Sequence, residues 1–298
     1  MYSRAVWCRF LAALLFAALA GCLQVPGQEL TTYREAFLEA KNAGVLLYDE
    51  LGASVLRAGG GPENQNCARS GAAAPACFDP YAAENPGAGS SIPEIRARLL
   101  ALETITLYNL AIVDLLEGKS EDALGQRIKD LQAVASDLLV VASISSGSLP
   151  GLINGPALGL LGGLVDKLDG MRVRALAAQS LRANIGTVRE IIDQLIADTP
   201  RMYTLYRRGQ GKYAAEVEIA AGSNDAVAMA AWARIGAYHD QLTAYVKVLN
   251  QTRDSADRLV EAMERGAGST DDLRAVIREA IEIRAAAGEF WDAVRASR

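Results

Sequence analysis

The sequence predicts an all-α protein, an elongated antiparallel bundle of long helices with coiled-coil-like seams and one disulfide-pinned loop. Apolar residues make up 51% of the 298 residues, which is ample for a core, yet aromatic residues make up only 6%. Alanine supplies much of the apolar share, and alanine and arginine are strong helix formers. Apolar side chains recur at helical spacing along most of the chain, and residues typical of helix starts and stops separate the runs.

Residues 1–21 have the three parts of a secretory signal: Arg4 and Arg9 near the start, a short apolar run, and small residues at its end. A membrane-spanning helix needs roughly 20 apolar residues, about twice the length of this run, so a cleaved signal peptide is the better interpretation. The sequence Leu19-Ala20-Gly21-Cys22 resembles the lipobox of bacterial lipoproteins. The resemblance implies cleavage before Cys22 and fatty acyl chains, such as palmitate, on that cysteine.

The implied lipid anchor would hold the protein on a membrane, because two or three acyl chains bind a bilayer far more firmly than one. In enteric lipoproteins, an aspartate directly after the lipidated cysteine retains the protein in the inner membrane, whereas Leu23 holds that position here. The resemblance therefore implies an outer-membrane lipoprotein that faces the periplasm, with the inner membrane as the alternative. Residues 22–29 would form the lipidated tether and residues 30–298 the helical bundle domain.

The charge and the residue types of the chain argue against several functions. Removal of residues 1–21 would leave 28 basic and 35 acidic side chains, a formal charge of −7, which disfavours a nucleic-acid partner. The one histidine, His239, has Gly236 where di-iron bundles have a glutamate three residues before the histidine, and no serine sits in a nucleophile elbow. We therefore expect no enzyme activity, no cofactor and no metal, and a structural role for His239.

The first predicted helix runs from Leu30 to about residue 57. Its apolar and small positions are Tyr33, Phe37, Ala40, Gly44, Leu47 and Leu51. Residues 58–91 lose this pattern and are rich in glycine, proline, asparagine and alanine, which predicts a long loop. Cys67 and Cys77 lie in this loop, and in an oxidising compartment they favour a disulfide that pins it. A metal site is the alternative reading of the two cysteines.

Three further helices are predicted before residue 200. The sequence Ser91-Ile92-Pro93-Glu94 has the pattern of a capping box with proline in the first turn, and its helix is predicted to end at Gly118. Ser120 is the expected N-cap of the next helix. The apolar stripe of that helix is Leu124, Ile128, Leu131, Val134 and Leu138. A third pattern runs from Leu164 to Leu195 and is predicted to end at Thr199-Pro200.

The most regular apolar pattern of the chain alternates steps of four and three residues, as in a coiled-coil seam. Its members are Tyr238, Leu242, Tyr245, Leu249, Thr252, Ala256, Leu259 and Met263. A last helix is predicted after Thr270. Its apolar face is Leu273, Ile277, Ala280, Ala287, Trp291 and Val294. Short turns between long helices make neighbouring helices antiparallel, and the seams could also bind a partner protein or a second copy of the chain.

Residues 138–165 contain no charged side chain, so this segment is expected to be buried all round, in protein or in lipid. Its glycines and prolines, among them Gly147 and Pro150, predict a bent hairpin rather than one helix. Each arm is too short to cross a bilayer. A buried position at one end of the bundle is the favoured reading. The alternative is insertion into one leaflet, since long helices with an apolar hairpin are similar to helical pore-formers of the cytolysin A type.

Residues 200–213 combine basic and tyrosine side chains without any acid. The candidate anion- or partner-binding residues are Arg201, Tyr203, Tyr206, Arg207, Arg208, Lys212 and Tyr213. In an acidic protein, such a stretch suits lipid headgroups, other phosphates or an acidic partner, although a solvated connector between helices has the same composition. The sequence as a whole favours a membrane-anchored structural or interaction module over a membrane-active protein, and favours an enzyme least.

Overall fold

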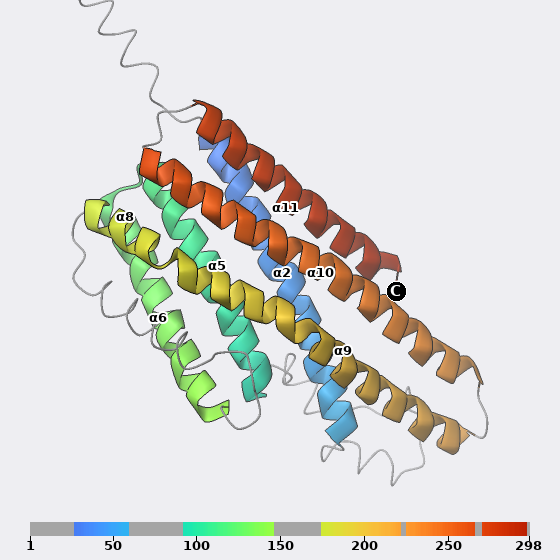
Figure 1. Ribbon diagram of the computed structural model, residues 1–298. Helices are drawn as coiled ribbons and strands as arrows, with labels where there is room; N and C mark the ends of the chain where they lie inside the picture. Colours follow the sequence, from blue (N-terminus) through green and yellow to red (C-terminus); the bar gives the residue numbers. More distant parts are fainter. Residues whose placement is uncertain (1–26, 60–91, 146–173, 222–224, 266–269, 297–298) are drawn as a thin grey trace, which may run out of the picture.

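The computed structural model describes residues 27–59, 92–145, 174–221, 225–265 and 270–296, and within these ranges every regular element is an α-helix (Figure 1). The predicted all-α class is therefore confirmed. The helices are α2 (Gly27–Gly59), α5 (Pro93–Leu116), α6 (Glu121–Ser145), α8 (Arg174–Ala183), α9 (Ile185–Ala221), α10 (Asp225–Arg265) and α11 (Thr270–Ala296). The expected signal peptide at residues 1–21, Cys22, Cys67, Cys77 and residues 146–165 lie outside the described residues.

The helices form one bundle in which α5 and α6, α9 and α10, and α10 and α11 run antiparallel, as predicted for helices joined by short turns (Figure 1). The antiparallel course of α9 and α10 is marked by the ion pairs Arg189–Asp257 and Arg253–Asp193. The contacts of α2 with α9 and α11 are parallel, because α2 runs in the same direction as both. With 41 residues at about 1.5 Å each, α10 is roughly 60 Å long.

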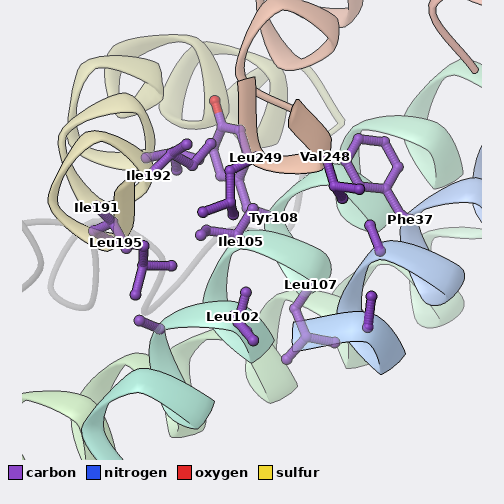
Figure 2. Close-up of a cluster of buried hydrophobic side chains, with 14 of the residues drawn as sticks. Phe37, Leu102, Ile105, Leu107, Tyr108, Ile191, Ile192, Leu195, Val248 and Leu249 are labelled. Atoms are coloured by element: carbon purple, nitrogen blue, oxygen red, sulfur yellow. The ribbon is translucent and has the colours of Figure 1, made fainter. Parts of the chain in front are cut away.

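The core lies where α2, α5, α9 and α10 meet. Figure 2 shows side chains from these four helices in one cluster: Phe37, Leu102, Ile105, Leu107, Tyr108, Ile191, Ile192, Leu195, Val248 and Leu249. The predicted seam of α10 is buried from Tyr238 to Leu259, and Met263 is partly buried. The buried face of α10 is wider than the predicted seam, since Ala244, Val248 and Ser255, which are not part of that seam, are also buried. This extra width arises because α10 packs against α2, α9 and α11 together.

Helix α5 is the most completely buried helix that the structure describes. Of the described helices, it alone is long and apolar enough to cross a membrane, yet 78% of its most apolar 18-residue stretch is buried inside the bundle. One side packs on α2, α9 and α10, and α6 covers another side. At the end that holds Gly27, Asp114 of α5 pairs with Arg34 of α2 at 2.8 Å and with Arg127 of α6 at 3.0 Å. This carboxylate therefore ties three helices together.

The link between α5 and α6 forms as predicted. Gly118 has a φ of 73°, and the N–H groups of Gly118 and Lys119 donate to the carbonyls of Leu115 and Asp114, which is a Schellman ending. The Ser120 hydroxyl accepts from the Ala123 N–H at 3.3 Å and caps α6. The start of α5 differs from the predicted capping box. Ile92 is the N-cap, without a side-chain cap, so the helix begins directly at Pro93.

The predicted helix end at Thr199-Pro200 is wrong, because α9 continues through Pro200 to Ala221. A proline inside a helix leaves the carbonyl four residues earlier without its N–H donor. Here that carbonyl belongs to Ile196, and the Thr199 hydroxyl donates to it at 2.8 Å. The predicted continuity from Leu164 to Leu195 is also wrong within the described part, since a turn at Asn184 separates α8 from α9.

The uncharged segment 138–165 begins inside α6, which extends to Ser145. Leu138 and Val141 are buried, but the side chain of Val140 is 57% exposed. Burial all round is therefore wrong for this part of the segment, because α6 buries a single stripe of side chains against α5. The chain also becomes helical three residues earlier than predicted, since α2 begins at Gly27 within the expected tether.

Candidate partner-binding surface

The candidate residues between Arg201 and Tyr213 lie on α9 rather than on a connector. A helix completes one turn every 3.6 residues, so the side chains of residues 201–213 lie on different faces of α9. The side chains of Arg207, Arg208 and Lys212 are exposed, and those of Arg201, Tyr203 and Tyr213 are half-buried. Tyr206 is fully buried. The prediction of one basic-tyrosine surface is thus wrong for Tyr206, whereas its basic members do reach the surface.

Tyr206 links three helices instead of offering a surface contact. Its ring stacks on Tyr238 of α10 with 3.8 Å between the ring centroids. Its hydroxyl donates to Glu50 Oε1 of α2 at 2.6 Å, and its carbonyl accepts from the Ser54 hydroxyl at 3.2 Å. The signal that could have identified it is helical spacing, because Met202, Tyr206 and Gln210 recur every four residues and all are buried.

Near the buried Tyr48, the core contains an ion pair that the sequence did not predict. Arg98 of α5 is almost completely buried, and its Nε and Nη2 atoms lie 2.6 Å and 2.5 Å from Oδ2 of Asp198 on α9. The third guanidinium nitrogen donates to the Glu94 carbonyl at 2.8 Å. Since the nearby acid neutralises the charge and the donors are used, this pair joins α5 to α9 and leaves little capacity to bind a ligand.

Buried tyrosines make up the rest of this polar region. Tyr48 and Tyr245 lie edge to face, with ring centroids 6.0 Å apart, and their hydroxyls are 3.3 Å apart. Burial raises the pKa of Tyr48, and it raises the pKa of Tyr238 and Tyr245 well above the ordinary value. Their hydroxyls therefore stay protonated at neutral pH and act as hydrogen-bonding groups, not as acids or bases.

The raised tyrosine pKa values predict unfolding in alkali. Burial raises the pKa of five buried tyrosines: Tyr33, Tyr48, Tyr108, Tyr238 and Tyr245. An unfolded chain releases these protons near pH 10 while the folded chain keeps them, so stability is complete below pH 10 and falls as the pH rises further. Each of these tyrosines lowers the free energy of unfolding by up to about 1.4 kcal/mol for every pH unit above 10.

The chain has ten tyrosines, and at least five of them should ionise only in a cooperative transition above pH 10 in which the helical circular dichroism signal is lost. Ionisation of more than five tyrosines near pH 10, with the helix signal intact, would contradict the burial of these hydroxyls. Absorbance and circular dichroism recorded on the same samples check this prediction.

The exposed basic residues of α9 lie toward the end of the bundle opposite Gly27. We call the two ends the Gly27 end and the Asp225 end, after the first residues of α2 and α10. The end of α10 and the start of α11 lie at the Gly27 end, and the hairpin of α9 and α10 forms the Asp225 end (Figure 1). Tyr206 of α9 lies beside Ser54, near the end of α2. Arg207, Arg208 and Lys212 come after Tyr206 in α9 and therefore lie close to the last turns of α2.

The neighbouring part of α10 adds exposed apolar side chains. Met229 is 70% exposed and Trp232 is 58% exposed. His239, expected to be structural, is exposed and lies edge to face on Tyr203 of α9, with 5.5 Å between the ring centroids. Residues 226–239 contain no acid. The surface of the hairpin thus combines basic, aromatic and apolar side chains from two helices.

Within the described ranges, no group of three or more histidine, cysteine, aspartate or glutamate side chains could hold a metal ion. No protein-family model, no curated protein and no solved structure matches the chain. The arrangement of the described side chains is therefore the basis for inferring function.

Proposed function

We propose that the chain is a lipid-anchored helical module that faces the periplasm and acts through contacts made at the Asp225 end of its bundle. The main support is the position of the two ends. Gly27 follows Cys22 by five residues, so the chain between them spans at most about 17 Å. Helix α10 alone is about 60 Å long. An anchor on Cys22 holds the Gly27 end near the membrane and leaves the Asp225 end free to reach a partner.

The finer parts of this proposal rest on the sequence. The lipobox at Leu19–Cys22 and the residue Leu23 favour the outer membrane, and Cys67 and Cys77 favour a disulfide in the 58–91 loop. The basic side chains of α9 support an interaction role, because they form a local positive region on an acidic protein. Binding, rather than catalysis, is the role that such a surface can perform.

Replacing Cys22 with serine should leave the protein uncleaved and without acyl chains, because serine offers no thiol for the thioether. The measurement is fractionation of cells fed a clickable fatty acid, followed by detection of the label on the protein. Cys8→Ser is the matched control, since Cys8 lies within the expected signal peptide, and it should leave labelling and membrane recovery unchanged. A Cys22→Ser protein that is still labelled and recovered with membranes would rule out the proposed anchor.

A further inference from the structure

Helices α6 and α9 both pack on α5, but among the described helices α6 has little contact with α8 or α9. On one side of α5, Asp114 pairs with Arg127 of α6. On another side, the Tyr108 hydroxyl donates to the Leu181 carbonyl of α8 at 2.6 Å. The side of α5 between these two contacts therefore separates α6 from α8 and α9.

The α5 residues on this intervening side are small and uncharged. At about 100° per residue, Asp114 lies about 120° around α5 from Tyr108, and Ala97 and Thr104 lie between them, about 20° and 40° from Tyr108. Ala97 and Thr104 are seven residues apart, close to two turns, so they lie one above the other. Both are completely buried.

One flank of α6 borders this side of α5. Arg127 marks the opposite flank, toward α2, because it binds Asp114, which also pairs with Arg34 of α2. Gln132 and Leu139 lie about 140° and 120° around α6 from Arg127, across the buried stripe. Both are half-buried and uncharged. The flank of α6 that they form therefore faces toward α9.

On α9, Gln194 lies on the side that faces toward α6. It precedes Tyr203 by nine residues, two and a half turns, and Tyr203 contacts His239 of α10, so Gln194 faces away from α10. It comes one turn before Asp198, which pairs with Arg98 of α5, so it lies beside α5. The Oε1 atom of Gln194 is buried and has no hydrogen-bond partner among the described residues. Whatever covers Gln194 is therefore expected to offer an N–H or O–H group.

The ends of one connection lie at the two ends of this intervening side. Residues 146–173, outside the described residues, join Ser145 of α6 to Arg174 of α8. Since α6 runs back along α5, Ser145 lies near the level of Pro93, where α5 begins. Helix α8 also runs antiparallel to α5, and it begins seven residues before its contact with Tyr108, near the last turns of α5. These levels are about 20 residues of α5 apart, roughly 30 Å, and the shortest path between them follows α5.

We infer that the segment 146–165 packs lengthwise on α5 between α6 and α9, against the surface formed by Ala97, Thr104, Leu139 and Gln194. The surface and the segment match in charge, because neither includes a charged side chain. Serine hydroxyls and backbone N–H groups of the segment are suitable donors for the Gln194 Oε1 atom. The segment would thus join α6 to α8 and α9 and would be unavailable to lipid. This inference goes beyond the proposed function and does not depend on the anchor or on the Asp225 end.

The test places the photoreactive residue p-benzoylphenylalanine at Gln194 of the full-length protein in intact cells. Illumination should link position 194 to residues 146–165 of the same chain, and mass spectrometry can identify the link because trypsin releases the two on different peptides. Asp193 is the matched control, since it is exposed and pairs with Arg253 of α10. The same photoreactive residue at position 193 should give less than about a tenth of this link, because it points toward α10.

The other outcomes of illumination overturn the inference. A link from position 194 to lipid would identify a membrane contact, and a link to a second protein molecule would identify a binding surface for a partner. A link to the described helices alone, or no link, would mean that the segment lies elsewhere.

A second measurement does not depend on photochemistry. Ala97→Cys should resist labelling by a maleimide in the intact bundle and should react at least about tenfold faster when a glycine-serine linker of equal length replaces residues 146–165. Ala135→Cys, at a completely buried position of α6, is the control and should stay protected in both proteins. Equal protection of position 97 with and without the segment would overturn the inference. Circular dichroism checks that each variant is folded, and if the linker variant is not, the photochemical link alone decides.

Discussion

Replacing Arg98 with methionine should lower the free energy of unfolding by about 3–5 kcal/mol, because Asp198 would stay in the core without its partner. Arg98 has a side chain that is 2% exposed, and it contributes two short contacts to Asp198 and one to the Glu94 carbonyl. Methionine has a similar length and high helix propensity, so the loss arises from the unpaired carboxylate. Urea denaturation followed by circular dichroism measures the change.

Two comparison variants make this result specific. The double variant Arg98→Met and Asp198→Leu should recover most of the lost stability, because it removes both buried charges. Lys247→Met breaks the exposed ion pair with Glu289, in which both side chains are 57% exposed, and should cost less than about 1 kcal/mol. If Arg98→Met lowered the free energy of unfolding as little as Lys247→Met, the Arg98–Asp198 pair would have to be open to water.

Replacing Gly209 with alanine should destabilise the bundle by about 1–3 kcal/mol, although alanine is normally the better helix former by about 1 kcal/mol. The reason is the close approach of α9 to α2. A Cβ atom at Gly209 would contact the Ser54 hydroxyl and lie 2.5 Å from the Ser54 carbonyl oxygen. Backbone atoms cannot rotate away as a flexible side chain can, so the two helices would have to separate.

Gly211, two residues further along α9, is the matched control. A Cβ atom there would meet nothing within 4 Å, so Gly211→Ala should stabilise the protein by about 0.5–1 kcal/mol. The two variants carry the same chemical change on the same helix and should differ in sign. Thermal and urea unfolding of both variants provide the measurement. Equal stabilisation by both would contradict the contact between Ser54 and α9.

The helices that could be predicted from the sequence are those whose local signals agree with their packing. Ser120 and Gly118 act through nearby backbone groups, so their roles follow from a few neighbouring residues. The spacing from Tyr238 to Met263 likewise identifies the buried face of α10. Pro200 misled the prediction because the donor that replaces its missing N–H is a side chain, the Thr199 hydroxyl, which a rule based on proline alone leaves out.

The candidate site was harder to predict, since it depends on which face of a helix meets another helix. Composition placed Tyr206 with the basic residues of α9, whereas its contacts with Glu50 and Tyr238 come from residues far away in the sequence. Arg98 was not predicted to be buried, although α5 is the one described helix apolar enough to cross a membrane, and that was a usable signal. Arg207, Arg208 and Lys212 are exposed, but the exposed Trp232 lies on a neighbouring helix and comes near them only because α9 pairs with α10.

The position of α2 has a mechanical consequence. This helix follows directly on the proposed tether, and it packs lengthwise against α5, α9, α10 and α11. A pull between the membrane and a partner at the Asp225 end would therefore load α2 along its axis and act on these contacts in shear. Many side-chain contacts must then slide together, whereas a helix attached at the edge could be peeled off one turn at a time. Helix α6, which packs mainly on α5, lies outside this path of force.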